Sequence, residues 1–409
     1  MIPHRHGPPE IAHNPRMTPV QLLARLVGVE STSHLPTTAI EAVILEAVDH
    51  PGVRIHRYDS GKGKSNLVLK TGPHSEHGEG LTLSGHMDCV PALEPDWDSD
   101  PFTLTIRDGK AFGRGACDMK GFDAIALTLL REAAERGVRE PLAVVITCDE
   151  EVGVQGAPQL LSQLPPSIGL PVRTIVGEPT DFLPVRGHKG VLCFRLTVAG
   201  RESHTSRPMD GHNAITDAGR LLAALEVERQ ELAQLSSGDA MLFADVPGAT
   251  LTVSGIAGGT AVNITPGQCT IEVGVRHLPD QRLGDITGRL ARAVGQAGLV
   301  PHAVRAGSSS PTLGTLPVGH CAIELLSRGE GYALPPHNAW VKQMCEACGT
   351  THATGAPYAT DAGALAQLGL QCVIWGPGHI NRAHRANEWI GLDELDRAEA
   401  FLRRLIPWR

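Results

Sequence analysis

The chain has 409 residues, of which 42% are hydrophobic and only 4% are aromatic. That length allows two or three domains, with cores built mainly from aliphatic side chains. A formal net charge of −8 without a basic run argues against nucleic-acid binding, and no apolar stretch is long enough to cross a membrane.

Residues 1–16 are polar, rich in His and Pro, and lack the apolar region of a secretory signal. We therefore expect a disordered extension on a cytoplasmic protein. The nine cysteines are an odd number spread along the chain, which is not the pattern of a disulfide framework. Cys345 and Cys348 form a lone CxxC, so scattered reduced thiols are expected, with a redox or structural zinc pair as the alternative.

In the first half of the chain, helical periodicity alternates with short apolar runs of strand length. The pattern predicts helices at 20–29, 38–50 and 121–136, and strands at 66–70, 81–85, 142–148 and 174–177. Such alternation predicts an α/β fold with a largely parallel sheet.

The pattern changes after residue 187. Residues 191–198 and 268–276 alternate apolar and polar side chains, as half-buried strands do, and a long helix is predicted at 213–235 between them. From about residue 317 the helical pattern returns, followed by a strand at 371–375. We therefore expect a catalytic domain formed by 17–187 plus 305–409, interrupted by an inserted α+β domain at 188–304.

Polar residues cluster directly after the predicted strands. His86 and Asp88 follow one strand, residues 149–151 follow the next, and Glu178 follows a third. The last strand leads through a glycine-rich turn to His384. Because ligands of open α/β sheets bind at the carboxyl ends of the strands, we expect these side chains to form a site.

The residue types in these clusters indicate a metal site. Two histidines and several carboxylates without paired thiolates suit zinc or another divalent ion. Asp118 lies between two glycine-rich segments, where a carboxylate can approach closely and bridge two ions. Two ions about 3.5–4 Å apart would polarise a carbonyl and activate water together. Each cluster alone is common in solvated turns, but four at four strand ends indicate a catalytic centre.

The motifs SGHMDCVP (84–91), DPFTL (100–104), GRGACDMKGF (113–122), TCDEEVG (147–153), GEPT (177–180) and GPGHINRAHRANE (376–388) carry a resemblance. The chain resembles the co-catalytic zinc family that contains acetylornithine deacetylase, succinyl-diaminopimelate desuccinylase, aminoacylase and glutamate carboxypeptidases. The resemblance implies a zinc-peptidase-like catalytic domain with a mostly parallel mixed sheet. It also implies a ferredoxin-like inserted domain that acts as a lid and forms a homodimer.

The resemblance further implies the metal ligands. His86, Asp118 and Glu178 would bind one ion, and Asp118, Glu151 and His384 would bind the other, with Asp118 bridging. Zinc is the metal that the family implies, and cobalt or manganese could occupy the same ligands.

Five further roles follow from the same motifs. Glu150 would be the general base and then the proton donor, and Asp88 would orient the imidazole of a histidine ligand. His204, reaching the active site of a partner subunit, would stabilise the oxyanion. Asn263 and Arg276 would hold the substrate, with Arg276 paired to its α-carboxylate.

Within the family, segments 184–190 and 358–362 and the pattern ending at His384 are most similar to the acetylornithine deacetylase branch. This implies deacetylation of N2-acetyl-L-ornithine in arginine biosynthesis. Ala359, Asp361 and the segment 206–209 depart from that branch. They keep other N-acyl-amino-acid hydrolases or carboxypeptidases and succinyl-diaminopimelate desuccinylase open, with a non-catalytic metal-binding homologue as the last alternative.

Overall fold

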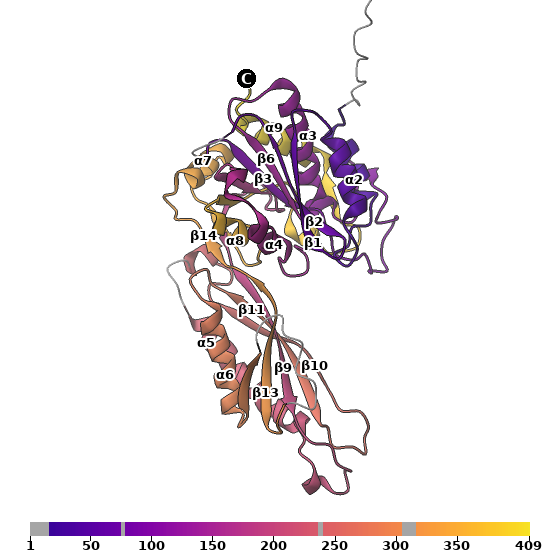
Figure 1. Cartoon of the computed structure of the whole chain (residues 1–409), viewed down its shortest axis with the longest axis vertical. Helices are drawn as coiled ribbons and strands as arrows, with labels where there is room; N and C mark the ends of the chain where they lie inside the picture. The colour runs from indigo at the N-terminus through magenta and orange to yellow at the C-terminus, as the bar shows by residue number, and fades with distance from the viewer. Residues whose placement is uncertain (1–15, 75–77, 236–239, 305–315) are drawn as a thin grey trace, which may run out of the picture.

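The computed structural model describes residues 16–74, 78–235, 240–304 and 316–409. The extension expected at residues 1–16 lies, except for Arg16, outside these residues. Two units follow one another along the long axis of the molecule, and the narrower one projects from the larger (Figure 1). Within the described ranges, no helix has the length and hydrophobicity needed to span a bilayer.

The larger unit is built on a nine-stranded mixed sheet with the order β1-β2-β6-β3-β7-β16-β8-β14, in which β15 also pairs with β8. The strands are β1 (Arg54–Gly61), β2 (Lys64–Thr71), β3 (Leu81–His86), β6 (Leu142–Thr147), β7 (Arg173–Val176), β8 (Val185–His188), β14 (Tyr332–Ala333), β15 (Thr354–Ala356) and β16 (Gln371–Ile374). The helices of this unit are α1 (Pro19–Val27), α2 (Thr38–Ala47), α3 (Gly121–Arg136), α4 (Gly156–Gln163), α7 (Ala339–Cys348), α8 (Ala362–Leu365) and α9 (Leu392–Leu405). A small sheet adds β4 (Thr105–Arg107), β5 (Lys110–Phe112) and β17 (Trp389–Gly391).

The centre of the large sheet is parallel and buried on both faces. Every residue of β3 and β6 is buried, because α1, α3 and α9 pack on one face and α4 and α8 cover the other. A strand covered on both sides reads as a continuous apolar run, which is the pattern that predicted these two strands. The predicted α/β class is confirmed, but the sheet is mixed: its central strands are parallel, whereas β1, β2 and β14 pair antiparallel at its edges.

The second unit is a five-stranded sheet with the order β10-β11-β9-β13-β12. Its strands are β9 (Gly190–Ala199), β10 (Thr250–Gly258), β11 (Gln268–His277), β12 (Val300–Val304) and β13 (His320–Gly329). The helices α5 (Ala214–Gln234) and α6 (Leu283–Gln296) lie on one side of it (Figure 1). One buried face and one face without helices explain the alternation that predicted β9 and β11.

β13 corrects the expectation for the region after residue 317. The helical pattern expected there begins only with α7, and residues 320–329 instead pair antiparallel with β9 in the second sheet. Three consecutive buried residues at 321–323 obscure the two-residue alternation of this strand. The boundary expected at residue 304 therefore moves beyond β13.

Two short connections join the units. One runs from β8 to β9 through Lys189, and the other runs from β13 to β14 through Glu330 and Gly331. They touch: a Cβ atom on Gly190 would lie 2.6 Å from the backbone nitrogen of Gly331. Glycine at both positions allows the two connecting segments to approach this closely.

His188, at the first connection, makes stability sensitive to acid. Burial lowers the pKa of His188 to about 4, so the imidazole is neutral when folded. Between that value and the usual pKa near 6.5 only the unfolded chain takes up the proton, so stability is full above pH 6.5 and falls as the pH drops. The loss reaches about 3 kcal/mol at most.

In the metal-free protein, His188→Gln should therefore lose less stability than the wild type between pH 7 and pH 4.5, measured by urea unfolding. The exposed His302, replaced in the same way, serves as the control. Equal pH dependence in the wild type and in His188→Gln would contradict this account.

Candidate metal centre

The predicted metal ligands gather where four neighbouring strands end. β6, β3, β7 and β16 lie side by side and parallel, so their carboxyl ends meet at one edge of the sheet. His86 is the last residue of β3, Glu151 lies in the turn after β6, and Glu178 lies two residues after β7. The loop after β16 brings His384 to the same edge.

Asp118 lies between the two histidines. It sits in an irregular turn before α3, with φ −123° and ψ 95°. One carboxylate oxygen lies 3.2 Å from Nε2 of His86, and the other lies 3.5 Å from Nε2 of His384. The Glu151 carboxylate lies 3.0 Å from the same nitrogen of His384. A carboxylate that turns one oxygen to each histidine has the geometry of a bridging ligand.

The side chains form two overlapping groups of three. Ligand atoms of His86, Asp118 and Glu178 lie within 4.8 Å of one another, and so do those of Asp118, Glu151 and His384. Imidazole and carboxylate donors without thiolates fit zinc, cobalt or manganese. The chain therefore carries two neighbouring candidate metal sites that share Asp118.

The electrostatics of the cluster fit bound cations. Burial, and then the charge of Glu178, raises the pKa of Glu150 well above its usual range, while burial and the charge of Asp118 do the same for Glu178. Hydrogen bonds to Asp118 and Glu151 raise the pKa of His384 to about 10. So many carboxylates in one buried site require positive charge close by, which divalent ions would supply.

The backbone sets the tautomer of His86. Its Nδ1 lies 2.9 Å from the carbonyl oxygen of Asp88, and with that nitrogen as the donor, Nε2 keeps a lone pair for a metal. The Asp88 carboxylate is farther away, at 3.7 Å from Nδ1. The backbone of Asp88, more than its side chain, therefore orients the imidazole.

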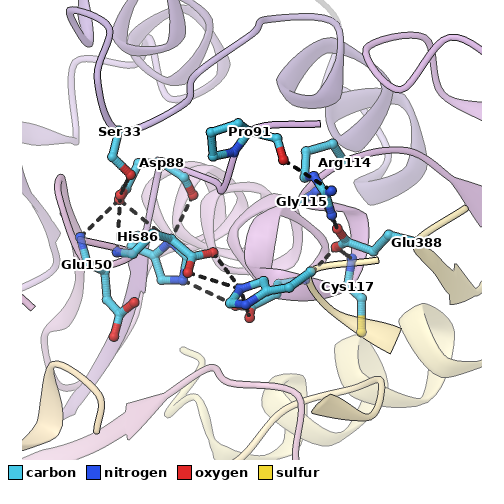
Figure 2. A network of polar contacts seen from close by, with 12 residues as sticks. Ser33, His86, Asp88, Pro91, Arg114, Gly115, Cys117, Glu150 and Glu388 are labelled. Atoms are coloured by element: carbon cyan, nitrogen blue, oxygen red, sulfur yellow. Dashed lines mark hydrogen bonds and ion pairs between the residues drawn. The ribbon is translucent and has the colours of Figure 1, made fainter. Parts of the chain in front are cut away.

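The Asp88 carboxylate instead contacts the turn that carries the predicted base. It accepts hydrogen bonds from the backbone N–H groups of Glu150 and Glu151, both at 3.2 Å, and from the Ser33 hydroxyl at 2.7 Å. Figure 2 shows Ser33 and Glu150 beside Asp88, with the carboxylate of Glu150 pointing away from it. The turn ends at Val154 with φ +56°, a strained conformation for a β-branched residue that costs roughly 1–3 kcal/mol. Asp88 thus helps to hold a strained turn in place.

A cleft of about 450 Å³ opens over the cluster. Both units line it: the first contributes Glu150, Tyr358 and every candidate ligand except the buried His86, and the second contributes Arg276, Cys193 and Ser327. Arg276 reaches the cleft because β11 pairs it with Val191, next to the connection between the units. Its guanidinium is the one Lys or Arg side chain among the described residues that line this cleft.

His204 and Asn263 lie elsewhere. They are neighbours, since Thr205 N–H donates to the Asn263 carbonyl oxygen at 3.0 Å, and both are exposed. His204 follows the end of β9 that is distal to the connections, and Asn263 lies in the loop before β11, whose first residue pairs with Ala199 at that same end. Ten residues of strand span about 30 Å. Neither residue therefore contacts the cleft of its own chain.

Sequence reasoning did not assign roles to several residues that the structure places around the site. Ser33 and Lys64 support the turn after β6, where the Lys64 ammonium lies 2.6 Å from the Asp149 carboxylate. Glu388 and Arg114 lie behind Asp118. Glu388 and Arg114 both occur inside the quoted motifs, but a motif does not distinguish a buried side chain that hydrogen-bonds the backbone from a metal ligand.

The comparisons agree with this geometry. The model of Peptidase family M20/M25/M40 matches residues 82–407. An acetylornithine deacetylase from Myxococcus xanthus is 33% identical over 393 residues, which cover 94% of this chain and 95% of that protein. An M20 family metallo-carboxypeptidase from Sulfolobus solfataricus has a TM-score of 0.72 at 16% identity, covering 95% of this chain and 98% of the other. A dinuclear metal-binding M20 peptidase from Bacillus subtilis has a TM-score of 0.58 at 16% identity, covering 95% and 96%.

A cluster of carboxylates and imidazoles at the ends of parallel strands, below a cleft that both units line, fits a metal-dependent hydrolase. The chain belongs to Peptidase family M20/M25/M40. Within that family it is a metal-dependent amidohydrolase, similar to curated acetylornithine deacetylases.

Proposed function

We propose that this enzyme hydrolyses the amide bond of an N-acyl amino acid, with N2-acetyl-L-ornithine as its substrate and zinc in both metal sites. The observation that carries the proposal is the position of Arg276, which lines the same cleft as Glu150 and the ligand cluster. A guanidinium there can pair with the α-carboxylate of a substrate whose amide lies over the ligands. The similarity to acetylornithine deacetylases supports the acyl and amino acid parts of the substrate.

The proposed reaction assigns a step to each of these side chains. When bound, two ions would polarise the acyl carbonyl and lower the pKa of an attacking water. Glu150 accepts the proton of that water as it attacks the acyl carbon. As the carbon–nitrogen bond breaks, Glu150 delivers the proton to the leaving amine. Arg276 fixes the carboxylate, so the scissile bond stays above the ligands.

The first prediction concerns Glu150. Glu150→Gln keeps the shape of the side chain but cannot accept a proton, so kcat should fall by roughly 10²–10⁴-fold while two ions still bind. The assay is a panel of N2-acetylornithine, succinyl-diaminopimelate and neutral N-acyl amino acids, with metal content measured in parallel. The matched control is Glu346→Gln on the exposed side of α7. Near-native turnover by Glu150→Gln would exclude Glu150 as the base. If the wild type preferred another member of the panel, that compound would replace N2-acetylornithine as the proposed substrate.

The second prediction concerns Arg276. Loss of a charge-assisted contact costs about 1.5–3 kcal/mol, so Arg276→Ala should raise KM roughly 10–100-fold with a smaller change in kcat. For acetylornithine amide, which lacks the carboxylate, the KM values of the wild type and of Arg276→Ala should differ little. Arg195→Ala on the neighbouring strand β9, where Arg195 pairs with the exposed Glu272, is the control. An unchanged KM would mean that another group binds the carboxylate.

We also propose that the enzyme is a cytoplasmic homodimer in which His204 and Asn263 complete the cleft of the partner subunit. The exposed ends of the second unit support this, because His204 lies near the fully exposed Met209 and Val262 side chains, at 90% and 101%. Histidine could donate a hydrogen bond to the oxyanion that forms on the acyl carbonyl.

The third prediction tests this arrangement by complementation. His204→Ala and Glu150→Gln should each be inactive, whereas co-expression should form mixed dimers with one intact site, made of Glu150 from one chain and His204 from the other. Random assembly predicts recovery of about a quarter of wild-type activity in a two-fold symmetric dimer. Activity no greater than the sum of the two parent variants, or a monomer in sedimentation equilibrium, would contradict the proposal.

A further inference from the structure

Glu388 is a buried carboxylate behind the metal centre that the proposed mechanism does not use. It lies immediately before β17 and is 1% exposed. One of its oxygens accepts hydrogen bonds from the backbone N–H of Gly115 and from Nη1 of Arg114, both at 3.0 Å. The other accepts from the backbone N–H groups of Cys117 at 2.9 Å and Asp118 at 3.1 Å. One carboxylate therefore receives four donors from the segment that ends at the shared ligand.

That segment has little regular structure of its own. Gly115 has φ +76°, and Asp118 departs from helical geometry. N–H groups in such a turn have no repeating partner along the chain, and a buried N–H without a partner costs free energy. Glu388 supplies the missing acceptors and so defines where the backbone of Asp118 lies.

Arg114 extends these contacts to two other ligand-bearing segments. Its side chain is fully buried, and Nη2 donates to both Glu94 oxygens at 2.6 and 2.7 Å and to the Pro91 carbonyl oxygen at 3.2 Å. Its Nη1 also reaches the carbonyl oxygen of Arg385 at 3.3 Å. Figure 2 shows Arg114 between Pro91 on one side and Glu388 on the other.

Arg114 and Glu388 thus join three stretches of chain. The first follows His86, the second contains Asp118, and the third follows His384. The pair is charge-assisted and enclosed, and hydrogen bonds between ionised groups in such surroundings are stronger than neutral ones. Neither side chain belongs to the two ligand groups, so they act on the metal through Asp118 and His384.

We propose that Glu388, held by Arg114, is a positioning residue for Asp118 and sets the affinity of the outer metal site, formed by Asp118, Glu151 and His384. This inference rests on the proposed two-ion function. The outer site is the sensitive one because His384, with 47% of its side chain exposed, has less packing to hold it than the buried His86. Its position depends more on the loop that Glu388 closes.

The test is Glu388→Gln in the full-length protein, titrated with Co²⁺ after removal of metal. An amide offers one acceptor oxygen in place of two and turns its NH₂ group toward backbone donors. Partners of metal ligands typically contribute 10–100-fold to metal affinity. Glu388→Gln should therefore bind its second Co²⁺ 10–100-fold more weakly than the wild type, and the visible absorption of the second ion should shift in intensity or wavelength. Affinity for the first ion should change less than fivefold.

The matched control is Glu94→Gln, which removes an outer partner of Arg114 but leaves the four contacts of Glu388 in place. Its two Co²⁺ affinities should stay within about twofold of the wild type, because the Asp118 backbone keeps its acceptor. If Glu388→Gln binds two ions with wild-type affinities and spectrum, the proposal is wrong. If Glu94→Gln weakens the second ion as much as Glu388→Gln does, the specific role of Glu388 is also wrong.

Should Glu388→Gln fail to fold, as judged by circular dichroism, Glu388→Asp carries the test. It keeps the charge, but a side chain shorter by one methylene cannot reach both pairs of donors, so second-ion affinity should again fall, and wild-type affinity would overturn the proposal. The titration measures metal binding and does not depend on catalytic turnover. Wild-type protein that binds two ions without hydrolysing any N-acyl amino acid would therefore contradict the proposed function and leave this inference standing.

Discussion

The constraint on which this structure depends is the amount of negative charge at one buried edge of the sheet. Asp118, Glu150, Glu151 and Glu178 lie together, and burial makes ionisation of such a group costly unless positive charge is close. His86 and His384 are placed against Asp118, and the two overlapping ligand groups offer room for two divalent ions. The parallel strands explain why the charges are together at all, because four carboxyl ends meet at that edge.

The same means of support occurs twice around this cluster. The Asp88 carboxylate accepts hydrogen bonds from the backbone N–H groups of Glu150 and Glu151, and the Glu388 carboxylate accepts hydrogen bonds from those of Cys117 and Asp118. In both cases a buried carboxylate takes the place of the regular hydrogen bonds that an irregular turn lacks. Ligand positions thus depend on acidic residues that never need to contact a metal, and loss of either acceptor leaves buried donors unsatisfied.

Much of the centre could be predicted from sequence because two simple rules apply. Buried strands such as β3 and β6 produce long apolar runs, and ligand-binding side chains are expected at the strand ends, which is why His86 and Glu178 are candidate ligands. Asp118 was predicted from the glycine-rich segments on either side of it, and the resemblance assigned it to both ligand groups, whereas no periodicity reveals its irregular turn. The contacts of the Asp88 carboxylate were not predictable, since two of its partners are backbone groups over sixty residues away and the third is the hydroxyl of Ser33. β13 was missed because contiguous buried residues hide its alternation.

The paired connections between the units have a mechanical consequence. A single flexible strand would let the second unit swivel about it, but two strands in contact at Gly190 and Gly331 resist torsion and leave bending as the softer movement. Arg276 is close to this axis and His204 is far from it. A small change of angle therefore moves Arg276 by little while sweeping His204 through a wide arc. The contact proposed between Arg276 and a substrate carboxylate would therefore change little during such a bend, whereas the distal end of the second unit would move farthest.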